Sequence, residues 1–383
     1  MVEHLDEIEF IREIEKQYLT KHNTNVVDVS NWNPGKNYIC KLFEILRLPS
    51  IDFDPKYIYS YELPLNIKEE ANRMLNIKEN SGTSVIFFQN GTIAEVNVIN
   101  FLALKGFKKI CILEPSYFNV SYIMNKFGLN VKKISLEFTN NNYIIPFNIL
   151  IKNQYDAVWI TSPVYSSGCY FNDIEIQKIK LLLDYGIFVV VDECVSLVGN
   201  EIYRKIGPHK NLVSIVCPHK TIIVNILKFS AIICDEEYED CFNIWLDLFS
   251  GGLLESNIKA IRHFISDNYK VCQDFMEKYT NDRRIEIEKV LNLSKGSNFI
   301  KKSTGQYCTL FYKDIPFEIS TQRSFIERVI NETGVSLVPG YLNGYGKNFG
   351  FGFRINLSLN KNELLSSILK LDEHFNSIIY KYK

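Results

Sequence analysis

The sequence has no excess of charge of either sign. Its 383 residues contain 43 Lys and Arg against 44 Asp and Glu, which gives a formal net charge of -1. Proteins that bind nucleic acid usually carry a basic excess, because Lys and Arg neutralise the phosphate backbone. The balance therefore favours a small molecule as partner and argues against nucleic acid. Hydrophobic residues at 46% and charged residues at 23% are ordinary for a globular protein, which excludes wholesale disorder.

Long apolar runs and metal-binding patterns are also missing. No segment approaches the roughly 18–20 uninterrupted apolar residues that a membrane helix needs, so no membrane partner is expected. Residues 1–10 are acidic and have no apolar core, so we expect neither a signal peptide nor a transit peptide. The 9 cysteines are scattered without a Cys-x-x-Cys pair, and the 6 histidines have no ligand-like spacing. This usage is typical of reduced thiols in the cytoplasm and predicts no metal site.

The middle of the chain alternates short apolar runs with helical patterns. The runs are rich in Val, Ile and Phe, and several are continuous, as in strands that are buried on both faces of a sheet. They lie at residues 84–88, 109–113, 156–160, 187–191, 212–216 and 229–233. The helical patterns between them lie at residues 94–105, 120–127 and 174–184. This alternation predicts an α/β fold with a mostly parallel central sheet flanked by helices.

The two ends of the chain do not continue this alternation. An amphipathic helix is expected at residues 5–19, and residues 236–279 are largely helical. Beyond about residue 283, strands mix with two helices, which indicates a smaller α+β domain; the helices are expected at residues 320–333 and 361–381. We therefore expect an N-terminal segment 1–50 that contributes to the small domain, a large domain 51–280 and a C-terminal small domain 281–383.

The residues that follow the apolar runs are the candidates for function, because ligands of an open parallel sheet collect at the carboxyl ends of its strands. These residues are Gln89-Asn90-Gly91-Thr92, Glu114-Pro115-Ser116-Tyr117, residues 161–168, Asp192-Glu193 and Cys217-Pro218-His219-Lys220. Together they offer a helix start that suits a phosphate, an aromatic ring, a carboxylate and a lysine. A cofactor that is a phosphorylated aromatic aldehyde needs this set of groups in its binding site.

In the order and spacing of these motifs, the chain resembles the class I/II aminotransferases, a family of fold type I pyridoxal-phosphate enzymes. The resemblance extends from about Asp28 to Ser358. It implies a large domain with a mainly parallel sheet, a smaller α+β domain and a homodimer. It also implies pyridoxal 5′-phosphate as the cofactor and an amino acid as the substrate, with transamination as the default reaction.

Two residues carry the chemistry that the resemblance implies. Lys220 stands where the family has its Schiff-base lysine, which then serves as general base at the substrate Cα. A free lysine has a pKa of about 10.4, so we expect nearby cations and partial burial to lower the pKa of Lys220. Asp192 matches the aspartate that pairs with the pyridine nitrogen and keeps the ring an electron sink.

Further matches concern the phosphate and the ring of the cofactor. Asn90, Gly91 and Thr92 match a loop that holds the phosphate at a helix N-terminus. Tyr117 matches an aromatic ring that stacks on the pyridine. Lys228 matches a phosphate-binding arginine, and Tyr61 matches a tyrosine that reaches the phosphate of the neighbouring subunit. Arg354 matches the arginine that binds the substrate carboxylate.

The chain departs from the family pattern around the ring oxygen of the cofactor. Tyr165 stands where the family has an asparagine that bonds this oxygen, Val195 replaces a tyrosine, and Cys217 replaces a serine. Our hypothesis is that Tyr165 serves as the replacement donor. The departures leave elimination, replacement, cyclisation or oxygen-dependent oxidation of an amino acid in specialised biosynthesis open as alternatives to transamination. A non-catalytic relative on an inherited scaffold is a further alternative.

Each of these residues also has a purely structural interpretation. A lysine after a strand is usually solvated, a carboxylate such as Asp192 can cap a helix, and Asn90-Gly91-Thr92 can be an ordinary turn. Tyr117 can be core packing, since the chain has 22 tyrosines. We favour the cofactor role for Lys220 and Asp192 because a bare charge after so apolar a run needs a partner. His219 is more often a packing residue, so we leave it outside the catalytic set.

Overall fold

Two units make up the chain, and the computed structural model describes residues 3–30, 34–46, 57–58, 69, 72, 82–139, 142–224, 228–250, 253–254, 262, 268–291, 298–299 and 303–382. Unit 1 contains Met1–Ile39, Tyr165–Gly168 and Glu277–Lys383. Unit 2 contains Cys40–Val164 and Cys169–Met276. The ranges expected from the sequence divide at 50/51 and 280/281 instead, and they do not include a short central segment that belongs with the chain ends.

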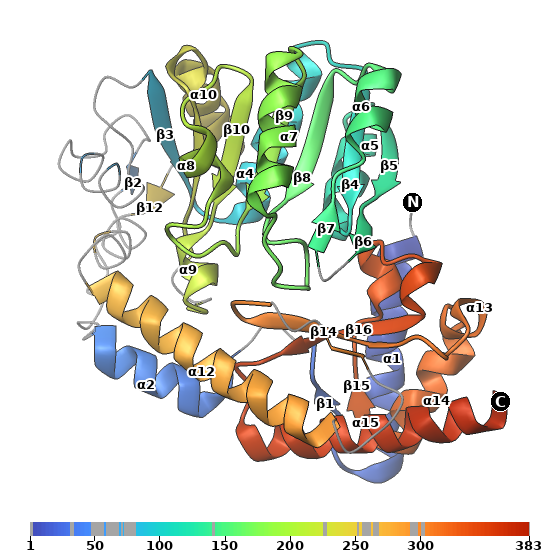
Figure 1. Cartoon of the computed structure of the whole chain (residues 1–383). Coiled ribbons are helices and arrows are strands. Elements are labelled where there is room, and N and C mark those ends of the chain that lie inside the picture. Colours follow the sequence, from blue (N-terminus) through green and yellow to red (C-terminus); the bar gives the residue numbers. More distant parts are fainter. Residues whose placement is uncertain are drawn as a thin grey trace. The chain divides into compact units, whose positions relative to one another are not determined.

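A seven-stranded sheet forms the centre of unit 2 (Figure 1). Its strands are β3 (Thr83–Phe88), β4 (Lys109–Glu114), β5 (Asn130–Ser135), β8 (Ala157–Thr161), β9 (Phe188–Glu193), β10 (Leu212–Val216) and β11 (Ser230–Asp235). They lie in the order β3-β11-β10-β9-β8-β4-β5. Neighbouring strands are parallel except at β11, which is antiparallel to both β3 and β10. The predicted mostly parallel sheet is confirmed.

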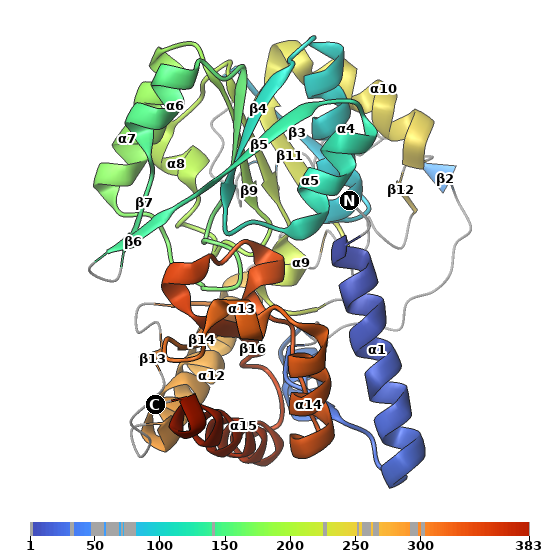
Figure 2. The ribbon, with the colours of Figure 1, turned by 90° about the vertical axis from the view of Figure 1, so that its right-hand side faces the viewer.

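Helices cover both faces of this sheet (Figure 2). One face is covered by α4 (Gly91–Leu104), α5 (Phe118–Lys126) and α10 (Glu239–Ser250). The other face is covered by α6 (Phe147–Asn153), α7 (Asp173–Asp184) and α8 (Ile202–Ile206). Every residue of β8, β9 and β10 is consequently buried, which explains why these strands are continuous apolar runs instead of alternating patterns.

Aromatic side chains fill the layer between the sheet and α4. The ring of Phe101 lies 5.6 Å from that of Phe188 on β9, 4.8 Å from that of Tyr238 and 5.0 Å from that of Phe242 on α10, measured between centroids. This packing fixes α4 against the centre of the sheet. The N-terminus of α4 is thereby held at the edge where the parallel strands end.

Unit 1 is built on an antiparallel sheet of β13 (Asn298–Phe299), β14 (Tyr307–Tyr312) and β16 (Phe351–Asn356). A separate parallel pair joins β1 (Val27–Asp28) to β15 (Val335–Ser336), which ties the N-terminal segment to the C-terminal part of the chain. The helices of this unit are α1 (Glu3–His22), α14 (Arg323–Thr333), α15 (Lys361–Tyr382) and the C-terminal part of α12 (Asn268–Leu291). Its core is rich in aromatic rings, among them Phe325, Phe351, Phe353 and Phe375.

Short elements complete the described chain. They are α2 (Lys36–Leu46), the hairpin of β6 (Glu137–Thr139) and β7 (Asn142–Ile144), the pair of β2 (Tyr57–Ile58) and β12 (Leu253–Leu254), α9 (Pro218–Thr221) and α13 (Phe317–Ser320). Three short 3-10 helices are η2 (Glu236–Tyr238), η3 (Gly340–Asn343) and η4 (Lys347–Phe349). Within the part of the chain that the structure describes, none of the helices combines the length and the apolar character that crossing a membrane requires.

Candidate active site

Three loops of unit 2 converge at the carboxyl edge of the sheet. Asp192 is the penultimate residue of β9, and the neighbouring strand β10 leads into α9, which carries Lys220. α4 begins at Gly91, shortly after the end of β3. The sheet topology thus brings an acidic group, an amine and a helix N-terminus to one place, as the spacing of the apolar runs predicts.

The start of α4 is closely packed against the lysine. The side chain of Asn90 caps the helix by accepting the backbone N–H of Ile93 at 3.1 Å. A Cβ on Gly91 would lie 2.7 Å from Sγ of Cys217 and 3.2 Å from Nζ of Lys220, so any larger residue would overlap the thiol. The position requires glycine because of this close approach, and the first turn of α4 therefore lies directly beside the Lys220 amine.

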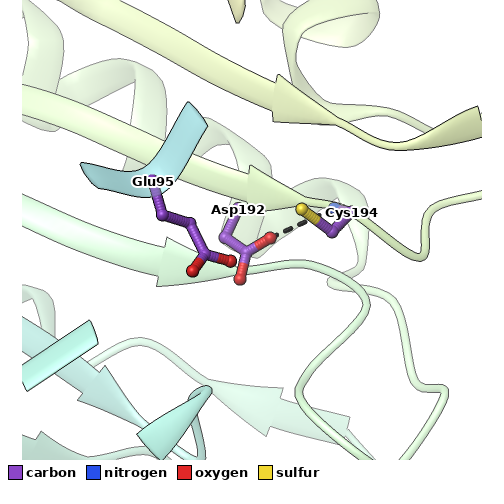
Figure 3. Close-up of side chains that lie close together, drawn as sticks. All are labelled: Glu95, Asp192 and Cys194. Atoms are coloured by element: carbon purple, nitrogen blue, oxygen red, sulfur yellow. Dashed lines mark hydrogen bonds between the residues drawn. The ribbon is translucent and has the colours of Figure 1, made fainter. Parts of the chain in front are cut away.

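Asp192 is buried, with 3% of its surface exposed. Its Oδ1 accepts the backbone N–H of Cys194 at 3.1 Å, which is the dashed line in Figure 3. Burial raises the pKa of Asp192, while the charge of Lys220 and the hydrogen bonding of Cys194 act to lower this pKa. The interaction with Lys220 shows that the carboxylate and the amine lie within electrostatic reach of each other, whereas the net rise in pKa reflects the apolar surroundings.

Lys220 has acidic neighbours where the sequence predicts cations. Burial lowers the pKa of its amine, but the surrounding groups raise this pKa, and the net value lies well above the usual range for lysine. In decreasing order of effect these groups are Cys194, Cys217, Glu95 and Asp192. The expected lowering of the Lys220 pKa is therefore not found for the protein alone, because the Asp192 carboxylate, and each of the other groups while it is ionised, stabilises the ammonium form.

Two thiols lie at the base of this cluster. Cys217 donates a hydrogen bond to Sγ of Cys194 at a sulfur–sulfur distance of 3.1 Å, and both residues are buried. The hydrogen bond to Cys217 and burial raise the pKa of Cys194 well above its usual range, so this group is a neutral thiol. All nine cysteines of the chain are free. Cys217 thus lies at the predicted site, in contact with a second thiol that the sequence does not single out.

The other predicted cofactor contacts of unit 2 lie after β3, after β4 and before β11. Thr92 is exposed in the first turn of α4. Tyr117 is half-buried at the start of α5, where the side chain of Asn119 donates to its hydroxyl at 2.8 Å. Lys228 is exposed just before β11. Tyr61 lies outside the described residues, so its role stays a prediction.

The predicted residues Arg354 and Tyr165 belong to unit 1. Arg354 lies on β16 with 4% of its surface exposed, and its Nη1 donates to the hydroxyl of Tyr165 at 3.2 Å. Its Nη2 donates to the backbone carbonyl of Ser30, and its guanidinium lies 4.7 Å above the ring of Tyr307. Arg354 and Tyr165, for which the sequence predicts separate roles, are thus hydrogen-bonded to each other.

His219 is a packing residue in this structure. It is 2% exposed, and its Nδ1 is in hydrogen-bond contact with the backbone of Phe229. Burial and the adjacent Lys220 lower the pKa of His219 to about 3, so the ring is neutral at ordinary pH. This environment supports leaving His219 outside the catalytic set.

Two residues of the site were missed at the sequence level. Cys194 follows β9 directly, and Glu95 lies one turn into α4. Three ligand-type atoms, one each from Glu95, Asp192 and Cys194, lie within 4.8 Å of one another (Figure 3). A signal for Glu95 did exist, because it is the single charged residue of the sequence 91–104. An ionisable side chain on a buried helix face indicates a polar cluster, and here the Glu95 carboxyl group lies beside that of Asp192.

The fold and the residues at this edge of the sheet are those expected of a pyridoxal-phosphate-dependent protein, and comparison with known families gives the same class. The model of the family "aminotransferase class I and II" matches residues 55–371. The chain therefore belongs to the class I and II aminotransferase family. This family depends on pyridoxal 5′-phosphate, which is the cofactor of the chain. No curated protein matches the sequence.

Solved structures share this fold at low sequence identity. A double mutant of the Thermus thermophilus aspartate aminotransferase aligns with a TM-score of 0.77 at 13% identity, over 94% of this chain and 95% of that chain. YbdL of Escherichia coli, identified as a methionine aminotransferase, aligns with a TM-score of 0.71 at 14% identity, over 95% and 96%. The pyridoxal-phosphate-dependent cyclase OrfR aligns with a TM-score of 0.75 at 12% identity, over 95% and 97%. The likeness establishes the fold type I architecture.

The residues at the carboxyl edge of unit 2 fit this cofactor. The first turn of α4 offers backbone N–H groups without intrahelical acceptors at the positive end of the helix dipole, which suits a phosphate. Because Gly91 has no Cβ, the backbone of the first turn lies close to the Lys220 amine. Asp192 provides a buried carboxylate that suits a protonated ring nitrogen.

Proposed function

We propose that this chain catalyses transamination of an amino acid with pyridoxal 5′-phosphate held at the carboxyl edge of unit 2. The observation that carries the proposal is the placement of the buried Asp192 and of Lys220 at and just after the ends of neighbouring strands, with the Lys220 amine beside the first turn of α4. When bound, the cofactor supplies an electron sink for charge that develops at the substrate Cα.

The residues of unit 2 have separate tasks in this proposal. Lys220 holds the cofactor through Nζ and then takes and returns the proton at the substrate Cα. Asp192 binds the ring nitrogen and keeps a proton on it. Asn90, Gly91 and Thr92 bind the phosphate through the first turn of α4. Four further cofactor contacts are proposed from the resemblance, namely Tyr117, Cys217, Lys228 and Tyr61.

Arg354 and Tyr165 are proposed to bind the substrate carboxylate and the ring oxygen of the cofactor, respectively. The planar guanidinium of Arg354 can bind a carboxylate through two parallel charged hydrogen bonds. The hydrogen bond between Arg354 and the Tyr165 hydroxyl supports a shared role for the two residues. Substitution of either is therefore expected to affect the other.

A second candidate function within the same cofactor class is elimination, replacement, cyclisation or oxygen-dependent oxidation of an amino acid. The observation that favours it is the tyrosine at position 165, whose hydroxyl accepts a hydrogen bond from Arg354 in unit 1. A ring-oxygen contact that differs from the family pattern would change how electrons leave the cofactor. The structural likeness to a pyridoxal-phosphate-dependent cyclase is consistent with this candidate.

We further propose that the chain acts as a homodimer in the cytoplasm and has a role in biosynthesis. The dimer follows from the family resemblance. The free state of all nine cysteines supports a reducing compartment. No nucleic-acid or membrane partner is part of the proposal.

Purification with pyridoxal phosphate tests the cofactor role of Lys220. The wild-type chain should show a visible absorbance band of bound cofactor, and Lys220→Ala should abolish this band because it removes the amine. Lys220→Arg is the matched control, since it keeps the positive charge but has no amine that can react. A visible band of equal strength in either variant would overturn the role of Lys220.

A screen of amino acids tests the reaction type. Transamination predicts more than one equivalent of keto acid per enzyme only when a second keto acid is supplied as amino acceptor. Release of ammonia without an acceptor would indicate elimination, and net oxygen uptake would indicate oxidation. Either of these results, in the absence of amino transfer, would replace transamination by the second candidate.

A further inference from the structure

Glu95 is a buried carboxyl group that the proposed reaction does not use. It lies on the face of α4 that packs on the sheet, with 1% of its surface exposed. Its carboxyl group faces that of Asp192 on β9, and the closest ligand atoms of Glu95, Asp192 and Cys194 lie within 4.8 Å of one another (Figure 3). Two carboxyl groups therefore share one water-excluded space.

The charges that act on Glu95 come from three different elements. Asp192 lies on β9, Cys217 lies at the end of β10, and Lys220 lies on α9. The thiols at positions 194 and 217 are hydrogen-bonded to each other. Lys220 is the only cation among the groups that act on Glu95, so the cluster holds one positive charge against two carboxyl groups.

Two ionised carboxyl groups would leave this cluster with an uncompensated buried negative charge. Buried like charges that lie this close cannot both ionise at neutral pH, so the pair keeps one proton. Asp192 accepts the N–H of Cys194, which stabilises its charged form. Among the described residues, Oε2 of Glu95 is buried without a hydrogen-bond partner. The better-supported anion is therefore Asp192.

We propose that Glu95 is a neutral carboxylic acid that holds the proton of the pair and keeps Asp192 as the single anion beside Lys220. The pKa of Glu95 agrees in direction, because burial raises it first and the charge of Asp192 raises it further, against the opposing effect of Lys220. The proposed location of this proton refers to the cofactor-free protein.

The consequence for Lys220 rests on the proposed function. An ionised Glu95 would add a second negative charge and raise the pKa of the Lys220 amine further. A neutral Glu95 avoids this rise, so a larger fraction of the amine is unprotonated and able to react. Glu95 is thus a positioning residue that acts through the charges of Asp192 and Lys220.

Infrared spectroscopy of the cofactor-free protein tests the location of the proton. The wild-type protein should show a carbonyl band of a protonated carboxylic acid that shifts in D2O, and Glu95→Gln should lack this band. Glu95→Met is a second variant of similar size that should lack the same band. Retention of every protonated-carboxyl band in a folded Glu95 variant would overturn the proposal.

Glu193→Gln is the matched control for this spectrum. Glu193 is also buried and has a pKa of about 8, but it accepts hydrogen bonds from Ser214 and from the backbone N–H of Ile202. Its protonated form should therefore give a separate band, which Glu193→Gln removes and Glu95→Gln leaves unchanged. Loss of the same band in both variants would assign the proton to Glu193 and contradict the proposal.

The rate at which Lys220 reacts with added pyridoxal phosphate gives an independent readout near neutral pH. Glu95→Gln replaces one neutral group by another, so its rate should stay within about threefold of the wild type. A threefold change in rate corresponds to a change of about half a unit in the pKa of Lys220. If Glu95 is ionised in the wild type, the variant lowers the pKa of Lys220 by about one unit or more and the rate rises about tenfold or more. Such a rise would overturn the proposal. Failure of the wild-type chain to bind the cofactor would overturn the proposed function instead, and the infrared result would still decide the state of Glu95.

Discussion

Asp192 and Glu193 are adjacent carboxyl residues with different environments, because successive side chains of a strand point to opposite faces of the sheet. Asp192 faces Glu95 of α4 and interacts with Lys220. Glu193 accepts hydrogen bonds from Ser214 and from the backbone N–H at the start of α8. Burial raises the pKa of Glu193 to about 8, so this side chain is mainly protonated at neutral pH. Sequence adjacency at the end of β9 therefore does not give the two residues the same role.

Glu193 should make the protein less stable as the pH rises. Its pKa is about 8 in the folded chain against an ordinary value of 4.5, so the folded state keeps a proton that the unfolded state has released. The free energy of unfolding then falls between these two values, by at most about 1.4 kcal/mol per pH unit. Glu193→Gln removes this contribution, because the amide does not titrate. Urea unfolding at several pH values measures the slope, and identical slopes in the two proteins would contradict the assignment.

The helix α4 carries three features of the site at once. Asn90 caps its N-terminus, Gly91 allows its backbone to approach Lys220, and Glu95 places a carboxyl group beside Asp192. The aromatic contacts of Phe101 hold the helix against β9 and α10. Packing several turns away from the site thus fixes the position of the first turn.

The approach at Gly91 predicts a specific steric conflict. Gly91→Ala places a Cβ 2.7 Å from Sγ of Cys217, so the variant should be overpacked and lose about 1–3 kcal/mol of unfolding free energy. Cys217→Ala in the same chain removes the overlapping sulfur and should recover most of this loss. Urea unfolding of the two single variants and the double variant forms a double-mutant cycle. Strict additivity of the two changes would show that the Cβ does not meet the thiol.

The elements that the sequence predicts best are those with the simplest physical signal. The buried strands β8, β9 and β10 are continuous apolar runs and are confirmed. The edge strand β5 (Asn130–Ser135) was missed because its residues are exposed or half-buried and include two lysines, so it has no apolar run. The helix expected at 320–333 corresponds to α14, which begins three residues later at Arg323, because Thr321 and Gln322 separate it from the short helix α13.

At the scale of the whole chain, the division into units depends on contacts between distant segments. Tyr165–Gly168 belongs to unit 1, where the hydroxyl of Thr309 donates to the carbonyl of Ser166 at 2.9 Å and the N–H of Thr304 donates to that of Gly168 at 2.8 Å. The local sequence pattern does not show which distant segments pair with each other. The boundaries expected from the pattern of strands and helices therefore differ from those of the two units.

The sequence predicts those residues of the site that directly follow buried strands. Lys220 and Asp192 follow neighbouring buried strands, so their convergence could be expected, although their catalytic roles stay predictions. Glu95 and Cys194 join the cluster only through the packing of α4 on β9 and a contact between two loops. The raised pKa of Lys220 was not foreseen for the same reason, since its acidic neighbours come from separate parts of the chain.

The most direct test of the central claim is to locate the lysine that binds the cofactor. The purified chain is incubated with pyridoxal phosphate, reduced with borohydride and mapped by peptide mass spectrometry. We expect one phosphopyridoxyl group, on the peptide that contains Lys220, and none on that peptide in the Lys220→Arg variant. A label mainly on Lys228 or spread over surface lysines would contradict the assignment of Lys220 and Asp192 as the centre of the site.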